Sequence, residues 1–85
     1  TPRRLKEVQA RVEVLRHRYG LSARHCGILS LVVQGLSNKE VSERLLCSEV
    51  NVESHMTTLL RRTASASRAV LVARFWLEFD LNNEP

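Results

Sequence analysis

The stretch Gly35-Leu36-Ser37-Asn38-Lys39-Glu40-Val41 predicts the beginning of a short helix. Ser37 is a suitable N-cap, and Glu40 stands three residues later, which is the capping-box pattern. Gly35 is suited to ending the helix before it. We expect the new helix to run from residue 38 to about residue 46. Its inner side is expected to carry Val41, Leu45 and Leu46.

A longer helix is predicted directly after it, over residues 49–62, with Ser48 as its N-cap. Apolar residues recur along one face of this helix at Val52, Met56, Leu59 and Leu60. Two helices joined by about two residues are typical of a helix-turn-helix, which places its second helix in the major groove of DNA. The polar side chains on the other faces are therefore candidates for contacting DNA. They are Asn51, Glu53, Ser54, Thr57 and Thr58.

Three further helices complete an all-α prediction. Residues 3–19 carry a narrow apolar stripe that ends at Gly20, and this stripe either packs within the domain or forms a short coiled-coil seam. A second helix is expected over residues 23–34, after Ser22 as N-cap. The last helix, over residues 68–79, is apolar on more than one side. It either contacts a second copy of the chain or packs one side only.

Length and composition narrow the class of protein. The 85 residues suffice for one small domain and exclude a large enzyme fold. The net charge of +4 suits a polyanionic partner such as double-stranded DNA. Two cysteines do not make a disulfide scaffold, and no apolar run is long enough for a membrane span, so we expect a cytoplasmic protein. Because the chain begins with Thr, it is expected to be part of a longer or processed protein.

Catalytic and metal sites are not predicted. No nucleophile stands near a base at a suitable spacing, and no glycine-rich phosphate loop is present, so we expect no enzyme. The soft metal ligands do not recur at the spacing of a binding site, so no metal and no cofactor are expected. These side chains are His17, His25, Cys26, Cys47 and His55.

The sequence resembles the DNA-binding domain of the LuxR-type (GerE-like) transcription regulators of bacteria over residues 19–76. The matching residues are Leu21-Ser22-Ala23-Arg24, Ile28-Leu29, the 35–41 stretch, Leu45, Ser48, Val52, His55, Arg61-Arg62 and Arg68-Ala69. The resemblance implies a four-helix DNA-binding domain over residues 21–79. Residues 1–20 would add an N-terminal helix, as a linker or a dimerisation element, and residues 80–85 an acidic tail. A sensor or receiver domain upstream would be a further partner.

The resemblance also implies roles for individual residues. Glu53, Ser54 and Thr57 would face the bases, with Asn51 and Thr58 beside them. The DNA backbone would be held by Lys39, Ser48, Arg61 and Arg62. The last helix would form a homodimer contact through Val72, Phe75, Trp76 and Phe79.

Several positions depart from the family pattern, among them Asn51 in place of a threonine and Arg62-Thr63-Ala64 in place of Lys-Leu-Gly. His25 replaces a glutamate, which predicts the loss of the capping box at residue 22, and Gly27 weakens its helix by roughly 1 kcal/mol relative to alanine. Glu53 replaces a lysine, which removes an attraction to phosphates, although a carboxylate can accept a hydrogen bond from cytosine. These departures keep a second interpretation open, in which the helix-turn-helix is mainly a protein-interaction or dimerisation module.

Overall fold

The computed structural model describes residues 2–77, and this part of the chain consists of helices without strands. The helices are α1 (Pro2–Tyr19), α2 (Ala23–Val32), α3 (Asn38–Leu45), α4 (Glu49–Arg62) and α5 (Arg68–Leu77). The all-α prediction is confirmed. The predicted start of each helix lies within one residue of the observed start, and α2 ends at Val32 rather than at Gln34.

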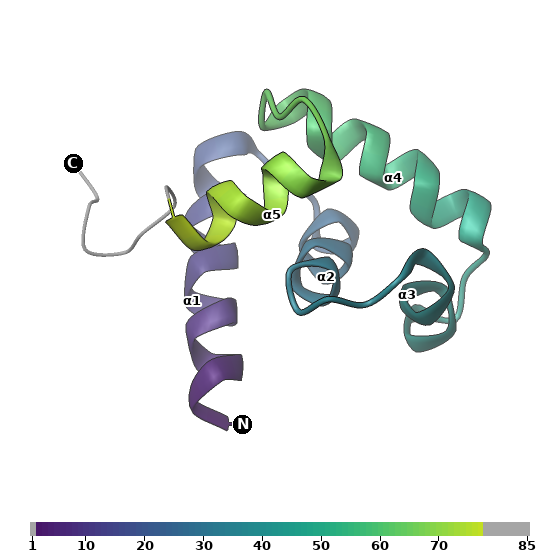
Figure 1. Cartoon of the computed structure of the whole chain (residues 1–85), viewed down its shortest axis with the longest axis horizontal. Coiled ribbons are helices and arrows are strands. Elements are labelled where there is room, and N and C mark those ends of the chain that lie inside the picture. The colour runs from purple at the N-terminus through teal and green to yellow at the C-terminus, as the bar shows by residue number, and fades with distance from the viewer. Residues whose placement is uncertain (1, 78–85) are drawn as a thin grey trace.

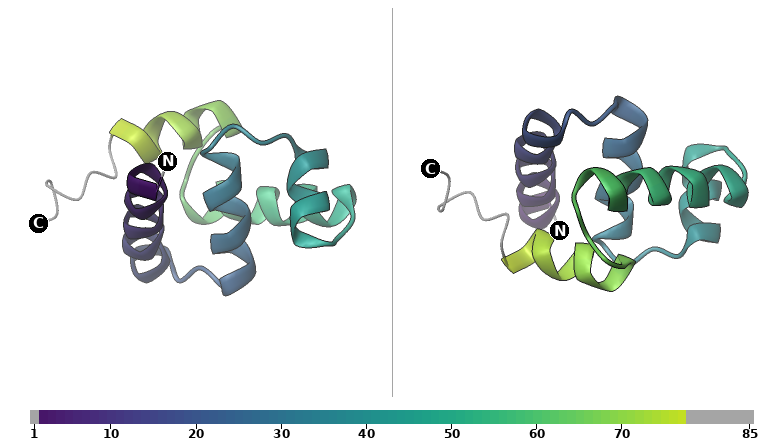
Figure 2. Two further views of the ribbon diagram at one scale, coloured as in Figure 1. Left: turned by 90° about the horizontal axis from the view of Figure 1, so that it is seen from below. Right: turned by 90° about the horizontal axis from the view of Figure 1, so that it is seen from above.

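The helices surround one core (Figure 1). α2 lies between α1 and the pair α3 and α4, and it contacts all three. In the view from above, α4 lies in front of the other described helices, while the N-terminal end of α1 lies behind them (Figure 2). The outer side of α4 is therefore left uncovered by the described part of the chain.

The core takes apolar residues from every helix. Val8, Val12 and Leu15 of α1 are buried in it, so the apolar stripe of α1 packs within the chain. The other buried apolar side chains are Leu21, Ile28, Leu29, Val32, Val33, Val41, Val52, Met56, Leu59, Leu71 and Phe75. The stripe is thus not available as a coiled-coil seam, although Leu5 at its N-terminal end is exposed.

The capping box at the start of α2 is present, so the prediction of its loss is wrong. Ser22 Oγ accepts a hydrogen bond from the His25 backbone N–H at 3.1 Å. In return, the Ser22 backbone N–H donates to His25 Nδ1 at 3.3 Å. The expected loss assumed that a carboxylate is required, whereas a neutral imidazole nitrogen also offers a lone pair.

The prediction that Leu46 faces inward is also wrong. Its side chain is 93% exposed, and its backbone has the left-handed angles φ 57° and ψ 47°. Leu46 is the C-cap of α3, and the chain turns there so that the Cys47 N–H donates to the Ser42 carbonyl at 3.0 Å. This turn directs the Leu46 side chain to solvent, because the helical phase of α3 ends at Leu45.

The connection between α4 and α5 consists of small and mostly polar residues, as predicted. Buried hydroxyl groups and an arginine of α5 hold it in place. Thr63 and Ser65 are buried, and their hydroxyl oxygens lie 2.9 Å apart. Arg74 of α5 donates to the Thr63 carbonyl at 2.6 Å and to Ser65 Oγ at 2.8 Å. These hydrogen bonds fix the end of α4 against α5.

Candidate nucleic-acid interface

Both helices of the helix-turn-helix begin at side-chain caps. Glu40 Oε1 accepts a hydrogen bond from the Ser37 N–H at 2.9 Å, and Ser37 Oγ accepts one from the Glu40 N–H at 3.2 Å. The backbone hydrogen bond from Ser37 is the main reason why the pKa of Glu40 lies below its ordinary value. At the next helix, Ser48 Oγ accepts from the Asn51 N–H at 3.0 Å. The capping predicted for α3 and α4 is therefore confirmed.

α4 has a buried side and an exposed side. Val52, Met56 and Leu59 anchor it in the core. The opposite side follows the spacing i, i+4, i+7 and i+11, and all of its members are exposed. We call this row the outer line of α4, and it consists of Val50, Ser54, Thr57 and Arg61.

The residues expected to read bases occupy the exposed part of α4, with one exception. Asn51, Glu53, Ser54 and Thr57 are exposed. Thr58 is half-buried, and its Oγ1 donates to the Ser54 carbonyl at 3.4 Å. Thr57 Oγ1 similarly donates to the Glu53 carbonyl at 3.1 Å, although its side chain stays exposed.

The cations expected to hold the DNA backbone lie near the start of α3 and at the end of α4. Lys39 is exposed in the first turn of α3, and Arg61 is exposed in the last turn of α4. Arg62 Nη1 donates to the Gly20 carbonyl at 2.9 Å, which ties the end of α4 to the end of α1. A guanidinium has further N–H donors, so this bond leaves donors for another acceptor.

Two features of α4 were missed by the sequence analysis. Val50 is 74% exposed on the outer line, but only polar residues were considered as candidates. His55 lies against His25 of α2, with ring centroids 5.2 Å apart in an edge-to-face arrangement.

Burial lowers the pKa of His25, and the neighbouring His55 and Arg62 lower it further. A neutral His25 can keep its Nδ1 lone pair on the cap of α2.

The residues expected to form a dimer contact differ in their exposure. Phe75 is completely buried in the chain's own core, which leaves it no surface for a second copy. Trp76 is half-buried, and its Nε1 donates to the Val33 carbonyl at 3.1 Å, while the Arg4 and Arg11 guanidinium groups lie 4.7 and 5.5 Å from its ring centre. Phe79 lies outside the described residues.

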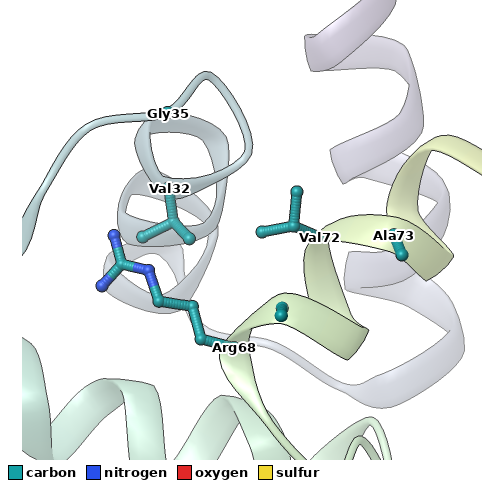
Figure 3. Close-up of a pocket in the computed structure, with 6 residues that line it drawn as sticks. Val32, Gly35, Arg68, Val72 and Ala73 are labelled. Atoms are coloured by element: carbon teal, nitrogen blue, oxygen red, sulfur yellow. The ribbon is translucent and has the colours of Figure 1, made fainter.

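Val72 keeps part of its side chain at the surface. It lines an open groove of about 640 Å³ between α2 and α5 (Figure 3). The groove is lined by Val32, Gly35, Arg68, Ala69, Val72 and Ala73. Its lining is mostly apolar, and Ala69 and Ala73 are exposed on α5.

No group of three metal-binding side chains comes together within residues 2–77. Cys26 and Cys47 are free and half-buried, and burial raises the pKa of the Cys26 thiol. None of the described helices is long and apolar enough to cross a membrane.

Residues 19–75 match the family of bacterial regulatory proteins described as the luxR family. The chain belongs to this family. The match begins at the last residue of α1 and includes both helices of the helix-turn-helix and most of α5. The family resemblance expected from the 35–41 stretch is therefore confirmed.

The chain is also similar to individual proteins that are named as transcriptional or response regulators. It is 43% identical over 70 residues to the probable transcriptional regulator ycf29 of Pyropia yezoensis, covering 82% of this chain and 32% of that protein. It is 43% identical over 58 residues to the response regulator Rre1 of Synechocystis, covering 68% and 25%. It is 35% identical over 66 residues to the uncharacterized transcriptional regulatory protein YhcZ of Bacillus subtilis, covering 78% and 30%.

The chain thus spans about a quarter to a third of the length of these relatives. No solved structure matches it significantly.

Proposed function

We propose that this chain binds double-stranded DNA through α4 as a homodimer and thereby regulates transcription. The observation that carries the proposal is the division of α4 into a side anchored by Val52, Met56 and Leu59 and an exposed outer line. A helix fixed on one side and uncovered on the other can enter the major groove, which admits one helix. Binding, rather than catalysis, is the role that these residues support.

Phosphate contacts are assigned to the cations and the cap around α4. Lys39 and Arg61 are exposed, and their charges would replace counterions on the DNA backbone. Arg62 would use the guanidinium N–H groups that do not bond to the Gly20 carbonyl. Ser48 Oγ accepts a hydrogen bond from Asn51, so its hydroxyl proton remains for a phosphate oxygen.

Base reading is assigned to the exposed polar residues of α4. Ser54 and Thr57 on the outer line offer hydroxyl groups, which act as donors or acceptors. Asn51 offers an amide on one flank, and Thr58 lies beside it with a half-buried hydroxyl. Glu53 on the other flank offers acceptor oxygens only, which fits the amino group of cytosine.

A homodimer would use the groove between α2 and α5. Val72 lines it, and the exposed Ala69 and Ala73 permit close approach of a second helix. Ala73→Glu places a charge on this surface and should give monomers in analytical ultracentrifugation. Ala10→Glu on the exposed side of α1 is the matched control and should leave the oligomeric state unchanged. A dimeric Ala73→Glu variant would exclude the groove as the interface.

Regulation is assigned to a separate domain of a longer protein. One relative is named a response regulator, and the chain covers 25% of its length. A receiver or sensor domain would then supply the signal, while residues 2–77 supply the DNA contact. We place this function in the cytoplasm of a bacterial-type cell, where its DNA lies.

A protein-interaction module is the second candidate function. It is favoured by the charges of α4, where Glu49 and Glu53 balance Arg61 and Arg62. A neutral helix gains less from the phosphate backbone than a basic one. The open apolar groove beside α5 would then receive a protein partner instead.

Salt-dependent binding distinguishes the two candidates. We expect a labelled random-sequence duplex to bind the chain in fluorescence anisotropy, and the affinity to fall steeply with salt concentration. Lys39→Ala and Arg61→Ala should each reduce the salt slope by about one unit. Lys6→Ala is the control, because Lys6 is exposed in the N-terminal half of α1, and the N-terminal end of α1 lies behind the other helices in the view that has α4 in front (Figure 2). Absence of binding at low salt, from a folded chain, would favour the interaction module.

A further inference from the structure

We infer that Val50 is a further base-reading residue of α4 and that it recognises the C5-methyl group of thymine in the major groove. The inference rests on the proposed function, because it requires that α4 enters DNA. It goes beyond that function by assigning a specific base to an apolar residue.

Val50 occupies the position on α4 that base contact requires. It stands four residues before Ser54 and seven before Thr57, so the three side chains share one line on the helix. Val52, Met56 and Leu59 fix the rotation of α4 by packing on the opposite side. If Ser54 and Thr57 face base edges, the same rotation directs Val50 toward the bases one turn nearer the start of α4.

Packing within the chain does not account for Val50. Its side chain is 74% exposed, whereas Val52 two residues later is fully buried. Valine is also a weaker helix former than the polar residues common at exposed positions, because its branched side chain loses rotamer freedom. An exposed valine in the first turn of α4 therefore contributes little to the fold and remains available for a ligand.

The chemistry of the major groove selects the ligand. Of the four bases, thymine alone presents a methyl group there, and the other groups along the groove floor are polar donors or acceptors. Glu49 and Glu53 flank Val50 with carboxylates that phosphates repel, so this end of α4 carries no cation for the DNA backbone. An apolar contact to a base edge is the favourable interaction that remains at Val50.

The test removes a single methyl group from the DNA and, separately, the two methyl groups of one valine from the protein. A preferred site is first selected from a randomised duplex library with the unchanged chain. Each thymine of that site is then replaced singly by deoxyuridine, which lacks the methyl group but keeps the same hydrogen-bonding groups. Binding is measured by fluorescence anisotropy for the unchanged chain, for Val50→Ser and for Val70→Ser, an equal exchange at an exposed valine of α5.

We expect one thymine-to-deoxyuridine replacement in each half-site to weaken binding of the unchanged chain about fourfold, as for the loss of one buried methyl-sized group. Val50→Ser should bind the two duplexes equally, and Val70→Ser should keep the difference. Introducing 5-methylcytosine at other positions of the deoxyuridine duplex should not restore the lost affinity. Folding of Val50→Ser is checked by circular dichroism, and its high exposure predicts an unchanged melting temperature.

The two ways of failing are distinguishable. If the chain binds DNA but Val50→Ser keeps the same preference for thymine over deoxyuridine, the role of Val50 is refuted and DNA binding stands. If the selected site contains no thymine whose methyl group matters, the role of Val50 is refuted in the same way. If the folded chain binds no duplex even at low salt, the proposed function fails and the role of Val50 fails with it.

Discussion

Arg11 of α1 donates a hydrogen bond from Nη1 to the carbonyl oxygen of Phe75 in α5 at 3.0 Å. Arg11 is 8% exposed, and its Nη2 also lies 3.2 Å from Glu7 Oε1. A cation at the C-terminal turn of a helix satisfies carbonyl groups that have no partner within that helix. The bond therefore joins the N-terminal helix to the last described helix.

Replacing Arg11 should destabilise the fold. Arg11→Met keeps an apolar stem but removes the donor, and hydrogen bonds of charged groups contribute about 1.5–3 kcal/mol. We expect the free energy of unfolding, measured with urea, to fall by about that amount. Arg4→Met is the control, since Arg4 is exposed and its contact with the Trp76 ring contributes about 0.5–1 kcal/mol. Equal losses in both variants would show that the Phe75 carbonyl does not need Arg11.

Stability should decrease with acidity because of His25. The folded chain holds the pKa of His25 below the ordinary 6.5, so the unfolded chain binds more protons as the pH falls. The contribution is fully present above the ordinary pKa and is lost as the pH falls through the lower folded value. Protonation also removes the Nδ1 lone pair that caps α2.

Melting temperatures between about pH 8 and about pH 5 measure this effect. His25→Gln should show a smaller decrease than the unchanged chain. His17→Gln, at a histidine whose side chain is 79% exposed on α1, should show the same decrease as the unchanged chain. A pH dependence that is identical in all three proteins would contradict the prediction.

Gly27→Ala should stabilise the chain. Gly27 lies inside α2, where alanine is preferred to glycine by about 0.8–1 kcal/mol. An added Cβ would meet Leu45 Cδ2 at 3.9 Å, an ordinary contact distance. The melting temperature should rise by about 4 °C in a domain of this size. Gly35→Ala should instead lower the melting temperature, because φ at Gly35 is +96° and alanine is strained there.

Glu53→Lys should tighten binding to random-sequence DNA and steepen its salt dependence. The exchange replaces a repelled carboxylate by an attracted ammonium group on the exposed flank of α4. Glu13→Lys makes the same change of charge on exposed α1 and controls for net charge. A salt slope that is unchanged in Glu53→Lys, or equally steep in Glu13→Lys, would show that position 53 does not face DNA.

The sequence predicted the parts of the fold that depend on neighbouring residues. Ser37 and Ser48 cap their helices because cap and acceptor are three residues apart, and this spacing is visible in the chain. The inner face of α4 followed in the same way from the spacing of Val52, Met56 and Leu59. The exposed positions of α4 could be predicted from the same periodicity.

The errors of prediction have separate physical causes. α5 is apolar on several sides, so its sequence did not indicate that Phe75 would be buried while Val72 reached the groove. The cap at His25 was missed because the imidazole was compared with a carboxylate by charge rather than by lone pair. Val50 was missed because only polar side chains were considered for DNA contact. The burial of Phe75 depends on the rest of the fold, whereas the His25 cap depends on a residue three positions away and on the chemistry of its ring nitrogen.

The backbone at Leu46 has a consequence for how far this surface can be altered. A non-glycine residue in the left-handed region of the backbone lowers stability by roughly 1–2 kcal/mol. The Leu46 side chain is exposed, so its packing does little to offset this strain. Glycine or asparagine would fit that backbone with less strain. Replacing Leu46 by one of these residues should therefore stabilise the fold. The added stability would allow substitutions on the outer line of α4 that recognise new target sequences but weaken the fold by themselves.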